Sequence, residues 1–392
     1  MTIAAITGLV LLAVVYAGHI LFFTFGWFRL KAISAKHLSG IVKDPSSPGK
    51  KILTILLPVR NEKEQISKAI FSLSKQDFSM MDAEVIIIDD GSVDDTVGQA
   101  EALIREMGDL RFRLIRLTGE GSKKKAIEAG IMAARGELIL VTDADCVHHP
   151  AWAGTMMMEF DRDDRMMVAG PVILERSHGF FTAFQELEFL GLVASGAGAA
   201  GAGHAIFCNG ANLAYRREAF LEVGGYAGNE RYRSGDDVFL LHRMKNRYGR
   251  KSVRFTLDPE AVVKTLPVAG PWDFLAQRAR WASKSRAYRD GLAISTALSV
   301  LGFNTLLVFF SLGMVTGFMG GREGLLLVAA WILKVVVDLP LLTGITRLAG
   351  RQRLLRAYPL FQLAYPFYIV AAALASLWGG ISWKGRRLSS RP

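Results

Sequence analysis

Four long apolar stretches constrain the fold of this chain more than any other feature of its sequence. The first begins at Ile3 with IAAITGLVLLAVVYAGHILFFTF, and the others cover roughly residues 292–318, 324–346 and 358–382. Each is long enough to cross the hydrocarbon core of a bilayer as a helix. The chain is also 51% hydrophobic and only 21% charged, which is unusual for a soluble domain. We therefore predict an integral membrane protein.

The membrane segments divide the chain. An N-terminal transmembrane anchor is expected at residues 1–27, and three transmembrane helices are expected at residues 292–383. The first stretch has no basic residues before it and no small-residue cleavage site after it, so it is read as an uncleaved anchor and not as a signal peptide. Residues 51–270, of mixed composition, are long enough to form a folded domain.

Basic residues gather where the apolar stretches end. They occupy a predicted juxtamembrane linker at residues 28–50 and the region after the third stretch, from Arg347 to Arg356. By the positive-inside bias both regions face the cytoplasm, and so does the large domain, which makes the protein a multi-pass cytoplasmic or inner-membrane protein. The basic tail, residues 384–392, would then lie outside, against the bias. Either the last stretch is re-entrant or the short tail is tolerated, and the sequence leaves both open.

The net charge of +11 does not indicate a nucleic-acid partner. The cations lie at membrane boundaries and do not form one groove-sized basic face. Two cysteines, Cys146 and Cys208, provide no disulfide framework and are compatible with a reducing cytoplasm.

The large domain alternates short strand patterns with helical patterns. The strand patterns are apolar throughout, which is typical of a parallel sheet covered by helices on both faces. We therefore expect an α/β domain with a doubly wound, mostly parallel sheet. In such sheets ligands bind at the carboxyl ends of the strands. The predicted strands cover residues 52–59, 84–90, 112–117, 137–145 and 166–174, with helices at 62–76, 94–107 and 123–136.

Polar residues follow three of these strands directly. Carboxylates at neighbouring strand ends need a compensating cation, although each acidic end taken alone could be ordinary turn chemistry. Two carboxylates separated by one residue, as in Asp143 and Asp145, suit Mg²⁺ or Mn²⁺ that also holds a diphosphate. Lys123 at a helix start adds a cation for an anion. The strand ends carry Pro58, Arg60, Asn61 and Glu62, then Asp89 and Asp90, then Asp143 and Asp145.

Two further segments carry candidate chemistry. Asp236 and Asp237 precede a helical pattern, where they are either helix-terminal acids or a site. In a group transfer to a hydroxyl, one carboxylate acts as general base, and Asp237 is the candidate. In residues 271–291 a helix is expected, with Gln277, Arg280, Trp281 and Lys284 on one face. That face either anchors the helix at the lipid interface or meets a ligand that is both anionic and flat.

Two apolar regions have alternative interpretations. Residues 180–220 begin with an aromatic and Gly/Ala-rich segment that predicts either a helix on the membrane surface or a flexible loop over a cleft. Lys334 and Asp338 are four residues apart inside the third span, where they are expected to pair; a structural pair is favoured over a proton relay.

Taken together, the motifs resemble the family 2 glycosyltransferases. The ordered set is LLPVRNE, IIIDDGSVDDT, SKKKAIEAGI, VTDADC, GDD and QRARW, over roughly residues 50–290. It is most similar to the membrane-bound branch, which includes polysaccharide synthases and ceramide glucosyltransferases. The resemblance implies a GT-A fold, a nucleoside-diphosphate sugar donor such as a UDP-sugar, a divalent metal and inversion at the anomeric carbon.

The resemblance also implies individual roles. Asp89 and Asp90 match the nucleotide-binding pair, Lys123 the basic position after the third strand, and Asp143 and Asp145 the metal and diphosphate motif. Asp237 matches the general base, although this chain has Gly-Asp-Asp where the family usually has Thr-Glu-Asp. Gln277, Arg280 and Trp281 match the Q-x-x-R-W motif, in which Arg280 would hold the departing diphosphate and Trp281 would form a flat floor for the acceptor.

The acceptor is not fixed by the motifs. Synthases that extrude a polymer generally need more helices than the four expected here, which favours a membrane lipid or lipid-linked glycan over a growing polysaccharide. An oligomer or a partner subunit could supply a channel. Two other classes are compatible with parts of the sequence: a nucleotidyltransferase, which would not need Asp237 or Gln277, and a membrane-tethered nucleotide-sugar-binding scaffold without catalysis. Alanine at Asp145 separates the scaffold from an enzyme.

Overall fold

The computed structural model consists of two compact units. The helical unit comprises residues 1–28, 177–202 and 267–392, and the sheet unit comprises residues 29–176 and 203–266. The residues described are 3–40, 52–79, 81–118, 121–161, 164–176, 178–228, 235–285, 287–317, 320–377, 382–383 and 386–387.

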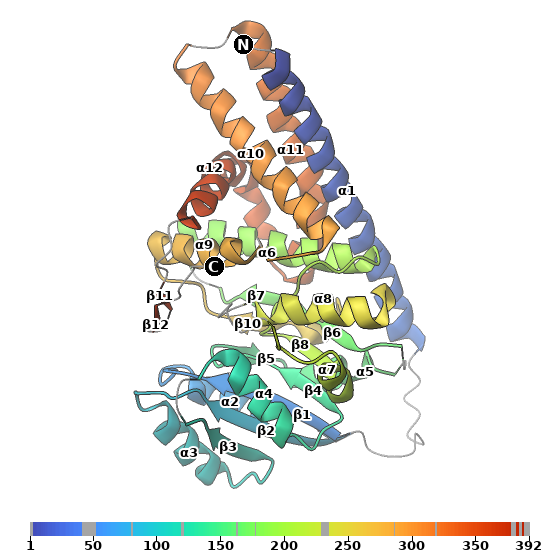
Figure 1. The fold of residues 1–392 in the computed structure, drawn as a ribbon, viewed down its shortest axis with the longest axis vertical. Coiled ribbons are helices and arrows are strands. Elements are labelled where there is room, and N and C mark those ends of the chain that lie inside the picture. Colours follow the sequence, from blue (N-terminus) through green and yellow to red (C-terminus); the bar gives the residue numbers. More distant parts are fainter. Residues whose placement is uncertain are drawn as a thin grey trace. The chain divides into compact units, whose positions relative to one another are not determined.

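The sheet unit is built on a seven-stranded sheet of order β3-β2-β1-β4-β8-β6-β9 (Figure 1). Its first four strands are parallel and β8 is antiparallel to both of its neighbours, which confirms the mostly parallel sheet predicted from the sequence. β1 and β4 are buried almost throughout, as strands covered on both faces must be. The strands are β1 (Ile52–Val59), β2 (Asp82–Asp89), β3 (Phe112–Arg116), β4 (Leu138–Val141), β6 (Met167–Ala169), β8 (Leu213–Arg216) and β9 (Val253–Phe255).

Helices follow the parallel strands in the expected places. α2 (Ile66–Ser74), α3 (Thr96–Met107) and α4 (Lys123–Ala133) connect β1, β2, β3 and β4 in turn. Ser122 caps α4 by accepting a hydrogen bond from Lys125 N. The rest of the unit contains α5 (Trp152–Met158), α7 (Arg217–Glu222), α8 (Asp236–Tyr248), η1 (Arg250–Ser252), η2 (Pro259–Ala261) and a small sheet of β5 (Val147–His148), β10 (Val263–Thr265) and β7 (Val172–Leu174).

The single strand predicted at residues 166–174 is wrong, because the structure has two strands there in different sheets. β6 joins the large sheet and β7 joins the small one, and Gly170 and Pro171 separate them. Pro171 has no N–H for a strand ladder, and the space beside Gly170 is filled by Asn212. A Cβ at position 170 would lie 2.3 Å from Asn212 Nδ2, so only glycine fits.

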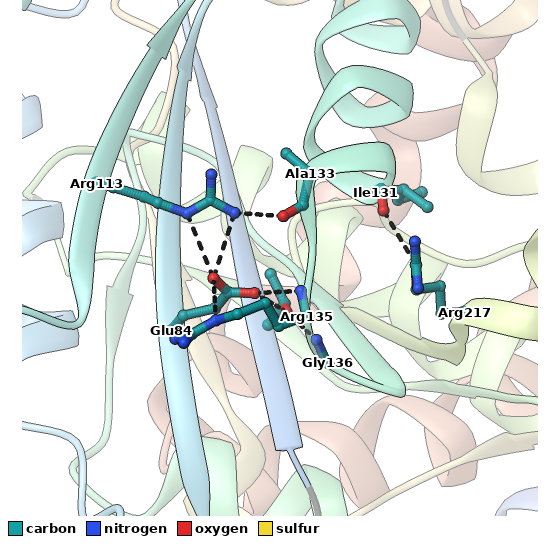
Figure 2. A network of polar contacts seen from close by, with 8 residues as sticks. Glu84, Arg113, Ile131, Ala133, Arg135, Gly136 and Arg217 are labelled. Carbon is teal, nitrogen blue, oxygen red and sulfur yellow. Dashed lines mark hydrogen bonds and ion pairs between the residues drawn. The ribbon is translucent and has the colours of Figure 1, made fainter.

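A buried carboxylate ties the amino ends of the parallel strands together (Figure 2). Glu84 of β2 is 1% exposed and accepts hydrogen bonds from Thr54 Oγ1 at 2.7 Å and from Arg135 N at 2.6 Å. The Arg113 and Arg135 guanidinium groups lie 3.3 Å from its other oxygen. Burial raises the pKa of Glu84, but these donors and cations outweigh it and the pKa is lowered overall. The network therefore holds together the amino ends of the strands. The candidate site lies at their opposite, carboxyl ends.

Four helices in the described part of the chain are long and apolar enough to cross a membrane: Ala4–Ser34, Gly291–Val315, Glu323–Leu348 and Tyr358–Ala375. They belong to α1 (Ile3–Gly40), α10 (Gly291–Val315), α11 (Gly321–Leu348) and α12 (Tyr358–Ala375). The helix of the anchor therefore continues past residue 27 into the predicted linker. The remaining elements are α6 (Phe180–Gly201), α9 (Pro271–Ser285), η3 (Gln352–Arg356), β11 (Ser382–Trp383) and β12 (Arg386–Arg387).

α6 is an ordered helix and belongs to the helical unit, although the sequence places it within the domain at residues 51–270. Its glycines bring its backbone against α1. A Cβ at Gly198 would lie 2.2 Å from Phe23 O, and a Cβ at Gly26 would lie 1.9 Å from Gly198 O. Small residues that allow backbones to approach closely are characteristic of helices packed in membranes. The segment is therefore a packed helix and not a flexible loop.

The predicted pairing of Lys334 and Asp338 is confirmed. Lys334 Nζ lies 2.7 Å from Asp338 Oδ2 and 3.2 Å from Tyr16 Oη. Tyr16 Oη donates to Asp338 Oδ1 at 2.6 Å, and Gln362 Nε2 donates to Asp338 Oδ2 at 2.9 Å. The pair thus links α1, α11 and α12, as expected for charged groups that are stable inside a membrane only when they have partners.

Candidate functional site

The first part of the candidate site lies where β1 and β2 end side by side. Val59 pairs in register with Asp89, so the next residues of both strands emerge at the same edge. Arg60 Nη1 donates to the carbonyls of Asp90 and Gly91, and Asn61 Oδ1 accepts from Val93 N at 2.9 Å. Asn61 has a positive φ of 51°, a conformation that asparagine tolerates better than most residues. The two loops therefore form one hydrogen-bonded structure.

Within this structure the carboxylates Asp89 and Asp90 are almost fully buried, at 4% and 5% exposed. Asp89 Oδ1 accepts from Ser92 N at 3.0 Å, which fixes its orientation. A Cβ at Gly121, in the loop before α4, would lie 1.6 Å from Asp90 Oδ1, so the chain passes directly over that carboxylate. Glu62 and Pro58 have structural positions here: Glu62 O accepts from Ile66 N at the start of α2, and Pro58 is a buried residue of β1.

Lys123 and Asp143 form the second part of the site. Lys123 is the first residue of α4, and Asp143 follows β4; Lys123 Nζ lies 2.5 Å from Asp143 Oδ1. Their side chains are 24% and 34% exposed, so the pair is partly buried and solvent still reaches it. Burial lowers the pKa of Lys123, but the carboxylates of Asp143, Asp236 and Asp237 outweigh it, and the pKa is raised overall. One ammonium group therefore lies among three carboxylates.

Asp237 faces this pair from the first turn of α8. The N-cap residue of α8 is Gly235, in a left-handed conformation, so no side chain caps the start of this helix. Asp237 Oδ2 instead accepts a hydrogen bond from Gly210 N at 3.0 Å, in the loop before β8. A Cβ at Gly210 would be 3.6 Å from Lys123 Nζ and 3.7 Å from Asp237 Oδ2, which places the two side chains near the same point. The helix-terminal interpretation of Asp237 thus accounts for only part of its environment.

Asp145 is half-buried beside Cys146, whose Sγ donates to Asp145 Oδ1 at 3.6 Å. Burial and the neighbouring carboxylates of Asp145 and Asp143 raise the pKa of the Cys146 thiol, so it stays protonated. Among the described residues, no three His, Cys, Asp or Glu side chains are arranged to hold a metal ion. The half-exposed oxygens of Asp143 and Asp145 nevertheless fit a hard divalent cation that takes its other ligands from a phosphate and water.

Gln277, Arg280 and Trp281 lie on α9 in the helical unit, and all three are half-buried. The helix was predicted over residues 271–291, but α9 ends at Ser285. Within the same helix Phe274, Arg278 and Ala279 are buried. The structure thus brings together Asp143, Lys123 and Asp237 in the sheet unit, and it places the Q-x-x-R-W residues on one helix of the other unit.

Sequence reasoning did not identify two groups that support these residues. One is the Gly210 amide that binds Asp237; the Asn-Gly pair at residues 209–210 is a turn signal that could have indicated it. The other is Arg278, inside the Q-x-x-R-W motif, which pairs with Glu188 of α6. No local sequence pattern predicts that Arg278 pairs with a residue as distant in the chain as Glu188.

Comparison with known proteins agrees with this geometry. Residues 54–224 match the model of glycosyl transferase family 2. This stretch contains β1, β2 and β4 with the carboxylates that follow them, and it ends shortly before α8. Residues 54–224 form a family 2 glycosyltransferase domain. The sheet unit has the corresponding GT-A fold, with its mostly parallel central sheet.

Several relatives of this glycosyltransferase domain extend over more of the chain. An N-acetylglucosaminyltransferase of Mesorhizobium japonicum is 27% identical over 282 residues, which cover 67% of this chain and 64% of the relative. The chain thus spans about two thirds of that relative's length. A dodecaprenyl-phosphate galacturonate synthase of Rhizobium johnstonii is 29% identical over 119 residues, covering 30% of this chain and 35% of the relative.

A similar solved structure is a mannosyltransferase of Pyrobaculum calidifontis in complex with GDP-Man and Mn²⁺. It has a TM-score of 0.61 and 17% sequence identity, and the match covers 95% of this chain and 99% of that one. The similarity shows a shared fold over almost the whole chain.

Proposed function

We propose that this protein is an inverting glycosyltransferase that moves a sugar from a nucleoside-diphosphate sugar to a membrane-associated acceptor, either a lipid or a lipid-linked glycan. The observation that carries the proposal is the group formed by Lys123, Asp143 and Asp237 at the carboxyl ends of the parallel strands. Its partly exposed ammonium and its three carboxylates, counting Asp236, match what a donor diphosphate with a divalent cation requires.

The donor is bound by the strand-end residues. Asp89 and Asp90 accept hydrogen bonds from base and ribose, and Arg60 contributes a guanidinium whose buried Nε has no hydrogen-bond partner among the described residues. Lys123 exchanges Asp143 for the donor phosphates when the donor binds, since phosphate carries more charge than one carboxylate. UDP is the proposed nucleotide; the solved Pyrobaculum mannosyltransferase contains GDP-Man, so the base is part of the test.

A divalent cation, Mg²⁺ or Mn²⁺, held by Asp143 and Asp145 would neutralise the diphosphate and so make it a better leaving group. Mn²⁺ in the complex of the Pyrobaculum mannosyltransferase supports such a cation. Asp237 takes the proton of the acceptor hydroxyl, and the Gly210 amide holds the carboxylate in position for that transfer. Arg280 stabilises the departing diphosphate, and Gln277 and Trp281 bind the acceptor end.

A membrane acceptor is supported by two observations. The four apolar helices associate the enzyme with the bilayer in which a lipid acceptor is dissolved. One relative is named for a dodecaprenyl-phosphate product, and another, from Dictyostelium discoideum, is a dolichyl-phosphate beta-glucosyltransferase. The basic residues around the first and third spans favour a catalytic domain on the cytoplasmic side.

The test is donor turnover by the purified protein in nanodiscs, screened with UDP- and GDP-sugars, Mg²⁺ or Mn²⁺, and a membrane-lipid extract. We expect metal-dependent donor consumption and a labelled product that partitions with lipid. Asp145→Ala should abolish it while leaving the unfolding temperature unchanged. A long water-soluble polymer would instead indicate a processive synthase, and nucleotide binding without turnover under all conditions would contradict a catalytic function.

A further inference from the structure

Arg278 occupies the second position of the Q-x-x-R-W motif and contacts two of the residues that the motif names: its Nη1 donates to Gln277 Oε1, and its guanidinium lies over the Trp281 ring. Its side chain is 4% exposed and forms a buried ion pair with Glu188 of α6, which is 2% exposed. Arg278 Nε lies 3.1 Å from each Glu188 oxygen, and Arg278 Nη2 also donates to Oε2. Tyr368 of α12 donates its hydroxyl to Glu188 Oε1 at 2.8 Å. A single carboxylate therefore connects three helices of the helical unit.

The guanidinium of Arg278 also lies against aromatic rings. Its Cζ lies 4.3 Å from the centroid of the Trp281 ring and 4.4 Å from that of Phe274, and the Phe189 ring is 6.1 Å from Trp281. Guanidinium stacks on aromatic faces while its edge makes bidentate hydrogen bonds to a carboxylate, which an ammonium cannot do. Trp281 thus rests on a planar cation whose rotation is fixed by Glu188.

We propose that Arg278, Glu188 and Tyr368 are positioning residues that hold Trp281 in the orientation needed for the acceptor. The inference rests on the proposed function, because the role of Trp281 comes from the family motif. A flat ring can act as a binding floor only if its plane is fixed, and small displacements of a positioned group cost large factors in rate. Glu188 acts on the reaction only through Arg278 and Trp281.

The helical unit contains a matched control. Glu186 of α6, two residues before Glu188, forms a buried ion pair with Arg351 in the loop between α11 and η3, and these side chains are 6% and 11% exposed. Glu186→Gln therefore disrupts a pair of the same kind on the same helix, but the pair joins α6 to the loop before η3 instead of to α9. A general loss of packing should affect both variants alike, whereas loss of Trp281 positioning should affect only Glu188→Gln.

The experiment combines steady-state kinetics with ¹⁹F NMR of fluorotryptophan-labelled protein in nanodiscs. The Trp281 resonance is assigned by its loss in Trp281→Phe. We expect Glu188→Gln and Arg278→Lys to shift or broaden this resonance and to lower kcat about 10- to 100-fold, with the donor KM little changed. Tyr368→Phe, which keeps the ion pair and should fold normally, should give the same changes to a smaller extent. Glu186→Gln should leave the resonance unchanged.

The outcomes separate this inference from the proposed function. An unchanged Trp281 resonance in Glu188→Gln, Arg278→Lys and Tyr368→Phe would overturn the positioning role whatever the kinetics show. So would a loss of kcat that is the same in Glu186→Gln as in Glu188→Gln and follows only the folded fraction. If the resonance responds as expected but the wild-type protein has no turnover with any donor, Trp281 positioning stands and the proposed transfer fails.

Discussion

Opposite charges meet in both units of this protein, but they are balanced differently. In the sheet unit Lys123 lies among three carboxylates, and its pair with Asp143 is about a quarter to a third exposed. In the helical unit the Arg278–Glu188 pair is almost fully buried, and one hydrogen bond from the Tyr368 hydroxyl to Glu188 adds to it. An open group with surplus carboxylates can accept a cation and an anionic ligand, whereas a closed and balanced pair can only hold its neighbours in place.

The sharpest way to break this comparison is to remove one charge from the open group. Asp237→Asn should lower transfer about 10²- to 10⁴-fold, because the acceptor hydroxyl loses its base, and the unfolding temperature should hardly change. Asp82→Asn, at the opposite end of β2, is the control and should keep wild-type activity. A rate above a tenth of the wild-type value in Asp237→Asn would exclude this carboxylate as the base.

Removing one charge from a buried and balanced pair should instead lower the stability of the protein. Lys334→Met leaves Asp338 without its ammonium partner inside the bundle and should cost about 3–5 kcal/mol of stability. The double variant Lys334→Met/Asp338→Leu should recover most of that loss, because no unpaired charge remains. Thermal unfolding in detergent measures both. If the single and double variants unfold at the same temperature, an unpaired Asp338 carboxylate is not destabilising and the prediction fails.

The Arg278–Glu188 pair can form only if α6 is held in the helical unit, and α6 is held there by its close contact with α1. In Gly198→Ala the added methyl group would lie 2.2 Å from Phe23 O, so α1 and α6 must separate, at a cost of about 1–3 kcal/mol. Gly18→Ala on α1 is the matched control, since no atom lies within 4 Å of its added Cβ. It should leave the unfolding temperature unchanged or raise it slightly. Equal effects of the two substitutions would argue against the contact.

The smallest change in stability is expected at a buried histidine of the sheet unit whose two ring nitrogens are both hydrogen-bonded. His148 is 6% exposed, with Ser72 Oγ 2.9 Å from Nδ1 and Thr142 Oγ1 2.7 Å from Nε2. Burial lowers its pKa to about 3. The unfolded histidine takes up a proton below pH 6.5, but the folded one does not until about pH 3, so its contribution to stability is complete above 6.5 and is lost as the pH falls.

This loss should amount to about 1.4 kcal/mol per pH unit below 6.5. His148→Gln should make the unfolding free energy less dependent on pH between 7 and 5. Glu84 does not interfere in this range, because its lowered pKa affects stability only below its ordinary value of 4.5. The measurement is the unfolding temperature at the two pH values, and an equal pH dependence in both proteins would contradict the prediction.

The sequence predicted those features that depend on local patterns. Continuous apolar runs followed by acidic residues predicted the parallel strands and the edge where Asp89 and Asp143 lie, because carboxyl ends of parallel strands must share one side of a sheet. Four apolar stretches predicted the four long helices, and the spacing of Lys334 and Asp338 predicted their pairing. Each of these needs only a few consecutive turns or strand residues.

Features that depend on distant contacts were not predictable. The glycine at the break between β6 and β7 is required by the distant side chain of Asn212, and the partner of Asp237 is the backbone of Gly210. The membership of α6 in the helical unit follows from backbone contacts with Gly26, and its composition alone also suited a loop. The roles of all the site residues, Asp145, Gln277 and Arg280 among them, remain predictions, since they concern ligands and not packing.

The place of α6 in the chain has a consequence for how the protein can be divided and synthesised. The sheet unit is discontinuous, and its two segments are separated by a helix whose packing partners include α1 and α11. A truncation that keeps residues 51–270 would carry this apolar helix without those partners, and we expect it to aggregate. A soluble fragment would require residue 176 to be joined to residue 203 by a short linker. During synthesis, likewise, α6 leaves the ribosome before α11 exists, so α1 is the partner already available to shield it.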